Sequence, residues 1–394
     1  MTARRSARFE TELAGYVGAR HALAVNSGTS ALVAALVGAG VGPGDEVLVP
    51  AYTWVSTAAA ALAVGAVPVL VEIDGSLTMD PADLAERITP RSRAVLPVHM
   101  GNHVADMDRI MEVAAAHDLV VIEDACQAIG ATYRGRQVGS IGHAGCFSFN
   151  QHKNIRAGEG GALVTGDTAL FDRAAMYHDV GSYERPGFRG ADTDLIVGVN
   201  LRMPELSAAV LRPQLARLDA QIARRHRHRG IMLEALAARV GRDLAPVPHQ
   251  DPARAAGLAV GFGSAQAAVC FAAGRGVHRL ADSGRHVYTN WRSLQARNPL
   301  HPARDPYAAV DREVDHGPDA CPRTLEILAR TCAIDLAPEL LTPAFRLLAR
   351  RTAARPGAAQ PGAAQPGVAR PGAVQPGVSQ PGVSGLRGAG TACT

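Results

Sequence analysis

The stretch SFNQHKNIRAGEGG, residues 148–161, contains Lys153, the single lysine of this 394-residue chain. The other 39 of its 40 lysine and arginine residues are arginines, so arginine supplies positive charge everywhere else. Arginine stays protonated in proteins, whereas a lysine amine can lose its proton and form a Schiff base with an aldehyde. We therefore interpret Lys153 as a reactive residue. The alternative is an exposed lysine without a chemical role.

Around this stretch, residues 20–165 alternate short β-branched runs with helical patterns. Such alternation predicts a mostly parallel sheet with helices on both faces. Ligands of such sheets bind at the carboxyl ends of the strands. The expected strands are 21–26, 46–50, 67–73, 93–99, 120–124 and 161–165, and the expected helices are 29–38, 53–64, 106–117 and 168–178.

The rest of the chain predicts a second domain and a tail. A long helical pattern from about residue 204 to about residue 240 resembles a bridge to a smaller domain. We expect a large domain at 1–215, a small mixed α/β domain at 216–350 and a disordered tail at 351–394. In the tail, Pro-Gly pairs recur every five residues and no aromatic side chain is available for a core.

Composition excludes several classes of function. The formal net charge is +4, part of it from the tail, which gives no electrostatic case for nucleic acid. We interpret the basic run 224–229 as a solvated helix face. The apolar run 58–71 is interrupted by Gly65 and Pro68, so no membrane span and no membrane partner is expected.

The cysteines and the first residues indicate the compartment. The six cysteines form no CxxC pair, which favours neither a zinc site nor a disulfide framework, and no metal ligand is expected. The first 20 residues lack the apolar core of a signal peptide. We expect a cytoplasmic protein with reduced thiols.

Three further positions agree with a reactive lysine. Asp124 ends the expected strand 120–124, where a carboxylate can keep a pyridine nitrogen protonated. Residues 27–30 lie between a strand and a helix start, where backbone N–H groups bind phosphate. Trp54 follows another strand and can stack on a flat heterocycle. Together with Lys153 these residues match what pyridoxal 5'-phosphate requires. The alternatives are an ordinary helix cap at 27–30, a core tryptophan and a capping aspartate.

With these motifs the chain resembles the DegT/StrS family of pyridoxal-phosphate-dependent sugar and aminocyclitol aminotransferases. The resemblance runs from about residue 8 to about residue 215 and less closely to about residue 345. It implies the aspartate-aminotransferase-like type I fold, an α/β class with a mostly parallel large-domain sheet and a smaller C-terminal α/β domain. The family's last helix is expected to be missing, because a Pro-Gly repeat follows residue 341. The matching stretches are 26–32, 52–58, 123–128, 148–161 and 200–203.

The resemblance also implies a role for each matching residue. Lys153 is the catalytic residue and holds the cofactor covalently, Asp124 pairs with the pyridinium nitrogen, and Gln127 lies near the ring hydroxyl. Trp54 stacks on the ring. Asn200 reaches the phosphate of the neighbouring subunit, so the resemblance implies a homodimer with shared active sites. The implied cofactor-binding residues are Gly28, Thr29, Ser30, Trp54, Asp124, Gln127, Ser148, Lys153 and Asn200.

The function implied by this resemblance is transfer of an amino group from glutamine or glutamate to a keto-cyclitol or keto-sugar in secondary metabolism. Related dehydratases carry histidine at the lysine position, so Lys153 favours amino transfer over dehydration. Segments 150–154, 286–291 and 321–325 look more like the cyclitol branch, with His286 and Tyr288 as polyol contacts or as ordinary packing. The alternatives are a nucleotide-linked keto-sugar substrate and a non-catalytic partner or regulator.

Overall fold

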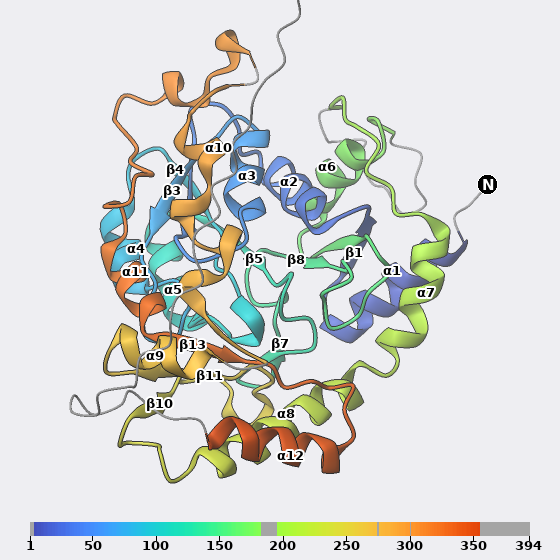
Figure 1. Cartoon of the computed structure of the whole chain (residues 1–394). Helices are drawn as coiled ribbons and strands as arrows, with labels where there is room; N and C mark the ends of the chain where they lie inside the picture. Colours follow the sequence, from blue (N-terminus) through green and yellow to red (C-terminus); the bar gives the residue numbers. More distant parts are fainter. Residues whose placement is uncertain (1–3, 183–194, 274–275, 300, 355–394) are drawn as a thin grey trace, which may run out of the picture. The chain divides into compact units, whose positions relative to one another are not determined.

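Seven strands form the central sheet of the protein, whose computed structural model describes residues 4–182, 195–273, 276–299 and 301–354. Their spatial order is β1-β9-β8-β5-β4-β2-β3 (Figure 1). Neighbouring strands are parallel except at β9, which is antiparallel to β1 and β8. The predicted mostly parallel α/β sheet is confirmed. The strands are β1 (His21–Val25), β2 (Glu46–Pro50), β3 (Val67–Val71), β4 (Ser92–Val95), β5 (Val120–Asp124), β8 (Ala144–Ser148) and β9 (Gly161–Thr165).

Helices cover both faces of this sheet, because successive side chains of each strand point to opposite faces. In β1, Ala22 and Ala24 pack with one core cluster, while Leu23 and Val25 pack with the other. Helices α2, α3 and α6 contribute to the second cluster, and α1, α5 and α7 contribute to the first. The helices are α1 (Arg4–Val17), α2 (Gly28–Gly38), α3 (Ser56–Ala63), α4 (Pro81–Arg87), α5 (Met107–Ala116), α6 (Thr168–His178) and α7 (Glu205–Leu215).

A second sheet lies in the C-terminal part of the chain. Its four strands are antiparallel in the order β10-β11-β13-β12, and α8 and α12 pack together beside it (Figure 1). The strands are β10 (Leu244–Pro246), β11 (Ala259–Phe262), β12 (Val277–Arg279) and β13 (Thr331–Ile334), and the helices are α8 (Leu218–Leu236), α9 (Ala265–Ala272), α10 (Arg292–Gln295), α11 (Pro322–Ala329) and α12 (Thr342–Ala353).

Shorter elements complete the described chain. A two-stranded hairpin consists of β6 (Thr132–Tyr133) and β7 (Arg136–Gln137). The 3-10 turns are η1 (Met100–Asn102), η3 (Pro252–Arg254), η4 (Leu280–Asp282), η5 (Gly284–His286), η6 (Tyr288–Asn290), η7 (Pro302–Arg304) and η8 (Pro306–Ala309). Within the described ranges, no helix is both long and apolar enough to cross a membrane.

Two sequence-based expectations are wrong. The single helix expected from 204 to 240 is two helices, α7 and α8, which meet at a non-helical Arg217. Pro213 lies in the last turn of α7, where it removes a backbone donor and favours an end to the helix. The last helix, expected to be missing, is present as α12, and it includes residues 351–353, which were assigned to the tail.

The domain prediction stays a prediction. Every residue described here belongs to one compact unit, Met1–Ala358. The boundary expected at residue 215 falls at the end of α7. The predicted tail from residue 355 onward lies outside the described residues.

Candidate active site

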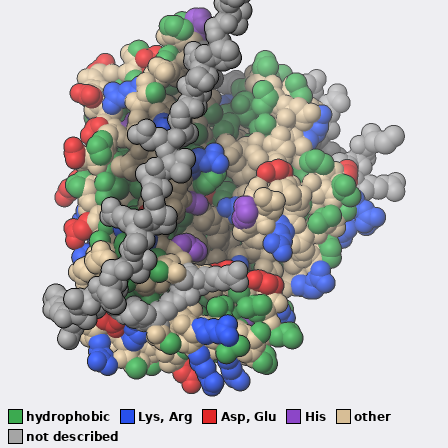
Figure 2. Space-filling view, in the orientation of Figure 1, with side chains coloured by type: hydrophobic (Ala, Val, Ile, Leu, Met, Phe, Trp, Pro, Cys, Tyr) green, Lys and Arg blue, Asp and Glu red, His purple; other side chains and the backbone are tan. Residues whose placement is uncertain are grey.

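A cavity of about 340 Å³ lies where the carboxyl ends of the central strands meet the second sheet. Its walls include segments after β2, β4 and β5 on one side and residues of β11, β12 and β13 on the other. Figure 2 shows a hollow in this face of the molecule, with basic and histidine side chains in it. The parallel strands thus open into a cavity at the edge where ligands of such sheets bind.

Lys153 is a half-buried residue of the cavity wall, in the loop between β8 and β9. The backbone N–H of Lys153 donates to the carbonyl of Asn150 at 3.0 Å. The next residue, Asn154, is buried, and its Nδ2 donates to Asn102 Oδ1 and to the carbonyl of Ile129, both at 2.9 Å. The loop is therefore anchored beside the lysine, so the Lys153 side chain extends from a fixed backbone.

Asp124 ends β5 with a side chain that is only 4% exposed. Its Oδ2 accepts a hydrogen bond from Thr57 Oγ1 at 2.7 Å, and its Oδ1 accepts one from the Cys126 N–H at 3.2 Å. Among the ion pairs of the described residues, none includes Asp124. A buried carboxylate ordinarily needs a charge partner, so this one leaves room for a cationic ligand atom.

The first turn of α2 forms a small polar cradle beside Asp124. The Ser27 hydroxyl caps the helix by accepting from the Ser30 N–H at 3.1 Å, which leaves the N–H groups of Gly28 and Thr29 without a partner inside the helix. A Cβ at Gly28 would lie 2.7 Å from Ser148 Cβ and 2.9 Å from Cys126 Sγ. Only glycine fits this contact, which brings Ser148, at the end of β8, against the helix terminus.

Ser30 and Cys126 have structural roles in this cradle. The Ser30 hydroxyl donates to Asn26 Oδ1 at 2.6 Å and lies 2.9 Å from Ser27 Oγ, as in an ordinary cap. Burial, and then the carboxylate of Asp124, raise the pKa of the Cys126 thiol, against the charge of Lys153. Cys126 is therefore a neutral thiol and not a nucleophile.

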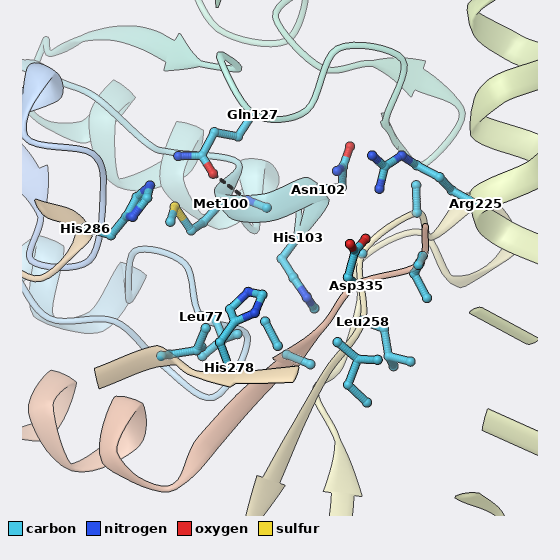
Figure 3. Close-up of a pocket in the computed structure, with 18 of the residues that line it drawn as sticks. Leu77, Met100, Asn102, His103, Gln127, Arg225, Leu258, His278, His286 and Asp335 are labelled. Carbon is cyan, nitrogen blue, oxygen red and sulfur yellow. Dashed lines mark hydrogen bonds between the residues drawn. The ribbon is translucent and has the colours of Figure 1, made fainter. Parts of the chain in front are cut away.

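Gln127, Trp54 and His286 surround the same region. Gln127 lines the cavity, and its Oε1 accepts from the Gly101 N–H at 3.3 Å (Figure 3). Trp54 is not a lining residue, but its ring lies 5.0 Å from the ring of His286, which lines the cavity. The guanidinium of Arg285 lies 4.5 Å from the Trp54 centroid. The indole is therefore held by a cation and an imidazole at the cavity edge.

His286 is a neutral hydrogen-bond acceptor toward the cavity. Its Nδ1 lies 2.9 Å from the carbonyl of Ser283, which can only accept, so Nδ1 carries the proton and Nε2 has a free lone pair. Burial, and then the charges of Lys153 and Arg285, lower its pKa. Tyr288 differs. It is 1% exposed, and its hydroxyl donates to the Pro318 carbonyl, so it belongs to the core and not to the cavity wall.

The comparisons with known proteins agree with this geometry. Residues 1–344 match the model of the DegT/DnrJ/EryC1/StrS aminotransferase family. The chain belongs to this family. The crystal structure of 3-amino-5-hydroxybenzoic acid synthase superimposes on this chain with a TM-score of 0.72 at 32% identity. The match covers 89% of this chain and 90% of that chain. The predicted type I fold is thereby confirmed.

Two relatives of this DegT/DnrJ/EryC1/StrS protein are named for different kinds of substrate. The dTDP-3-amino-3,4,6-trideoxy-alpha-D-glucose transaminase of Streptomyces venezuelae is 45% identical over 248 residues, which are 62% of this chain and 64% of that one. The L-glutamine:2-deoxy-scyllo-inosose aminotransferase of Micromonospora echinospora is 40% identical over 238 residues, which are 59% and 57% of the two chains. The matches span less than two thirds of these relatives.

Asn200 lies apart from the cavity of this family member. It is exposed, pairs as a β-bridge with Asp179, and accepts from the Arg202 N–H through Oδ1 at 3.2 Å. Val197 and Val199 beside it are 90% and 46% exposed. Within one chain, Asn200 therefore does not line the cavity, although the next residue, Leu201, accepts from the Asn26 N–H at 2.8 Å, just before the α2 cradle.

Several cavity residues were missed by the sequence analysis. Asn102 and His103 follow β4, and their polar side chains after a strand are a signal that could have found them. Burial lowers the pKa of His103 to about 3, helped by the charges of His249 and Arg229, so His103 is neutral. Figure 3 shows Asn102, Arg225 and Asp335 together, away from Gln127 and His286. Arg225 belongs to the basic run 224–229, and the interpretation of that run as a solvated helix face is wrong, because Arg225 lines the cavity and His228 is fully buried. Asp335 comes from a distant segment and has no local sequence signal.

Proposed function

We propose that the protein is a pyridoxal 5'-phosphate-dependent aminotransferase that moves an amino group from glutamine or glutamate to a keto-cyclitol or keto-sugar. The observation that carries this proposal is the combination of Lys153 on the cavity wall with a buried Asp124 that has no cationic partner among the described ion pairs. The open first turn of α2 beside Asp124 supports it. Family membership supports the same chemistry.

The residues present fit this cofactor. The N–H groups of Gly28 and Thr29, with the Ser148 hydroxyl, would hold the phosphate, because a helix N-terminus favours an anion. Asp124 would hold the ring nitrogen in its protonated form, and Lys153 would attach covalently. When bound, the cofactor supplies an electron sink for the bond that breaks at the amino carbon.

The chain's own residues then carry out the proton transfers. Lys153 would be the base that takes the proton from the donor α-carbon and returns it to the cofactor carbon on the other side of the transferred nitrogen. Thr57 holds the Asp124 carboxylate in place through its 2.7 Å hydrogen bond.

For the acceptor we favour a keto-cyclitol over a nucleotide-linked keto-sugar. The neutral His286 Nε2 offers an acceptor for a hydroxyl group beside the reactive lysine. The glutamine:keto-inosose relative supports this choice, while the dTDP-sugar and GDP-perosamine relatives support the alternative. Turnover with a cyclic polyol ketone, compared with a nucleotide-linked keto-sugar at equal concentration, separates the two substrates.

We also propose a homodimer with shared active sites in the cytoplasm. Apolar side chains are exposed in the segment beside Asn200 and on α7, namely Val180, Leu195, Val197, Val199, Leu206 and Val210. A second copy of the chain that covered these side chains would bury Asn200 as well. Asn200 would then lie beside the active site of the second copy. The described cysteines are all free thiols, as in a reducing compartment.

The test of catalysis uses the one lysine. Purified protein mixed with pyridoxal 5'-phosphate should show visible absorbance from covalent attachment, and borohydride should fix the label in the peptide that contains Lys153. Lys153→Arg keeps the charge but cannot attach, so it is the matched control. Adding glutamine should bleach the band. Binding without bleaching would favour a non-catalytic partner or regulator, and loss of a substrate hydroxyl would favour a dehydratase.

A further inference from the structure

The side chain of Glu123 is a fully buried carboxylate on the opposite face of β5 from Asp124. It is 0% exposed. Its oxygens accept from the N–H groups of Gly139, Ile141 and Gly142 at 2.6–2.7 Å. Consecutive strand residues point to opposite faces, so Glu123 lies behind the site residue Asp124 and cannot touch a ligand in the cavity.

The fourth donor to Glu123 is the imidazole of His99. Its Nε2 lies 2.9 Å from Glu123 Oε2, and its Nδ1 lies 3.2 Å from the N–H of Ala105. An N–H can only donate, so Nδ1 has no proton and Nε2 carries it. His99 is therefore a neutral ring that donates to the carboxylate and accepts from the backbone. The negative charge of Glu123 is held by four N–H donors and not by a cation.

His99 connects Glu123 with Asp124 and with the cavity wall. The His99 N–H donates to the Asp124 carbonyl at 3.1 Å, and the Asp124 N–H donates to the Pro97 carbonyl at 2.8 Å. The His99 ring joins both ends of the segment 99–105, which contains the cavity-wall residues Met100 to His103. Within that segment, Gly101 and Asn102 have positive φ angles of 57° and 66°. Asparagine tolerates this left-handed conformation, and hydrogen bonds to Asn154 and His249 also hold Asn102 in the wall.

We propose that His99 and Glu123 are positioning residues for the reaction: their hydrogen bond fixes Asp124, and the hydrogen bond from Ala105 to His99 fixes the cavity wall. This inference rests on the proposed function, because it assigns the pair a role toward the cofactor and the ketone. The alternative is that the pair only stabilises the core.

Two nearly isosteric variants separate the two hydrogen bonds. His99→Asn places an amide oxygen near the Nδ1 position and can keep the bond from Ala105, but it cannot reach Glu123. His99→Gln places an amide N–H near the Nε2 position and can keep the bond to Glu123, but it loses the bond from Ala105. The control is His228→Gln, since His228 is also a fully buried imidazole, hydrogen-bonded to the Leu336 carbonyl and stacked on Phe345 in the second sheet's core.

The measurements are the dissociation constant for pyridoxal 5'-phosphate, the absorbance maximum of the loaded protein, KM for the ketone and hydrogen exchange of the cofactor-free protein. We expect His99→Asn to weaken cofactor binding about tenfold and shift the absorbance, because a buried carboxylate loses a donor. We expect His99→Gln to bind cofactor within about threefold of the natural protein, yet to raise KM for the ketone.

The outcomes are distinct. The proposal is overturned if both His99 variants only lower the melting temperature, like His228→Gln, with unchanged cofactor binding, absorbance and KM. If the unsubstituted protein itself fails to bind pyridoxal 5'-phosphate, the proposed function fails, and with it the role of the pair toward the cofactor. Hydrogen exchange is independent of the cofactor. Faster exchange of the backbone N–H groups of residues 139–142 in His99→Asn alone supports the proposal that His99 fixes Glu123. Equal exchange in both variants contradicts it.

Discussion

At the scale of single residues, the Thr57 hydroxyl is the side-chain group that holds Asp124. It lies 2.7 Å from Asp124 Oδ2 and 2.8 Å from Thr53 Oγ1, and both threonines are fully buried. A carboxylate that faces a ligand needs such a donor to keep one orientation, and besides Thr57 the Cys126 N–H donates to Asp124, at 3.2 Å.

Replacing Thr57 by Val should remove this hydrogen bond at nearly constant volume. We expect a loss of about 1–3 kcal/mol in the free energy of unfolding, because the buried carboxylate loses a donor, and a weaker affinity for pyridoxal 5'-phosphate. Thr57→Ser keeps the hydroxyl and is the control. Denaturant titration and cofactor titration measure the two effects. Equal cofactor affinity in both variants would show that Thr57 does not orient Asp124.

A methyl group at Gly28 should damage the phosphate cradle. The new Cβ would lie 2.7 Å from Ser148 Cβ, inside van der Waals contact, so we expect Gly28→Ala to cost roughly 1–3 kcal/mol of stability and to weaken cofactor binding. Gly15 in α1 has no atom within 4 Å of its added Cβ. Gly15→Ala should therefore stabilise the helix by about 0.5–1 kcal/mol. Melting curves that rank the two variants the other way contradict this reading.

The buried His103 should make stability depend on pH. Its pKa is about 3 in the folded protein and about 6.5 in the unfolded chain, so the unfolded chain binds the extra proton between these values. The stabilisation is fully present above about pH 6.5 and is lost as the pH falls toward 3. We expect His103→Gln to show a shallower fall in unfolding free energy over this range. Parallel curves for the two proteins would contradict the assignment.

At the scale of elements, the sequence predicted best where hydrophobic runs are uniform. The bounds of β2, β5, β9 and α6 agree with their predicted ranges. Strand β8, AGCFS, was missed because small and polar residues give no β-branched run, although its five residues are fully buried between β5 and β9. Tertiary packing overrides weak strand propensity there.

Helix α12 shows a different reason for an error. Its buried residues Phe345, Ala349 and Thr352 recur at helical spacing, but the Pro-Gly repeat that follows favoured a tail without structure. Phe345 is fully buried and stacks on the ring of His228 at 4.0 Å. The sequence pattern therefore indicates the buried face of α12. It does not indicate that this face packs on α8, because that contact depends on the tertiary structure.

Shortening the buried aromatic of α12 should destabilise the second sheet's core. We expect Phe345→Ala to cost about 3–5 kcal/mol, because a large buried side chain leaves a cavity. Leu347 lies on the same helix but is 53% exposed, so Leu347→Ala should cost well under about 1 kcal/mol. Urea unfolding of both variants measures the difference, and similar midpoints would show that α12 does not belong to the core.

At the scale of the whole molecule, the sequence predicted part of the candidate site. Lys153 and Gln127 line the cavity, and Gly28, Ser148 and Asp124 meet around Cys126, as strand-end positions should. The position of Arg225 and Asp335 on the opposite wall could not be predicted, because it depends on how the second sheet packs. The predicted contact of Asn200 with a neighbouring subunit stays a prediction.

The exposed apolar residues beside Asn200 lead to a prediction about assembly. We expect Val197→Glu to shift the protein from dimer to monomer and to lower its cofactor affinity, because a charge in an apolar interface is costly. Leu341 is also highly exposed, at 74%, but precedes α12. Leu341→Glu should leave the mass unchanged. Light scattering gives the mass, and a natural protein that is already monomeric would refute the shared-site proposal.

The cavity takes its apolar walls from the central-sheet side (Tyr52, Leu77 and Met100) and from the second sheet (Leu258 and Ile334), and this has a thermodynamic consequence. A small molecule that contacts both walls binds only while both are folded. Saturation with such a molecule should then raise the melting temperature of the protein. By the same linkage, a substitution inside the second core, far from Lys153, will change how tightly substrate binds without touching any atom of the chemistry.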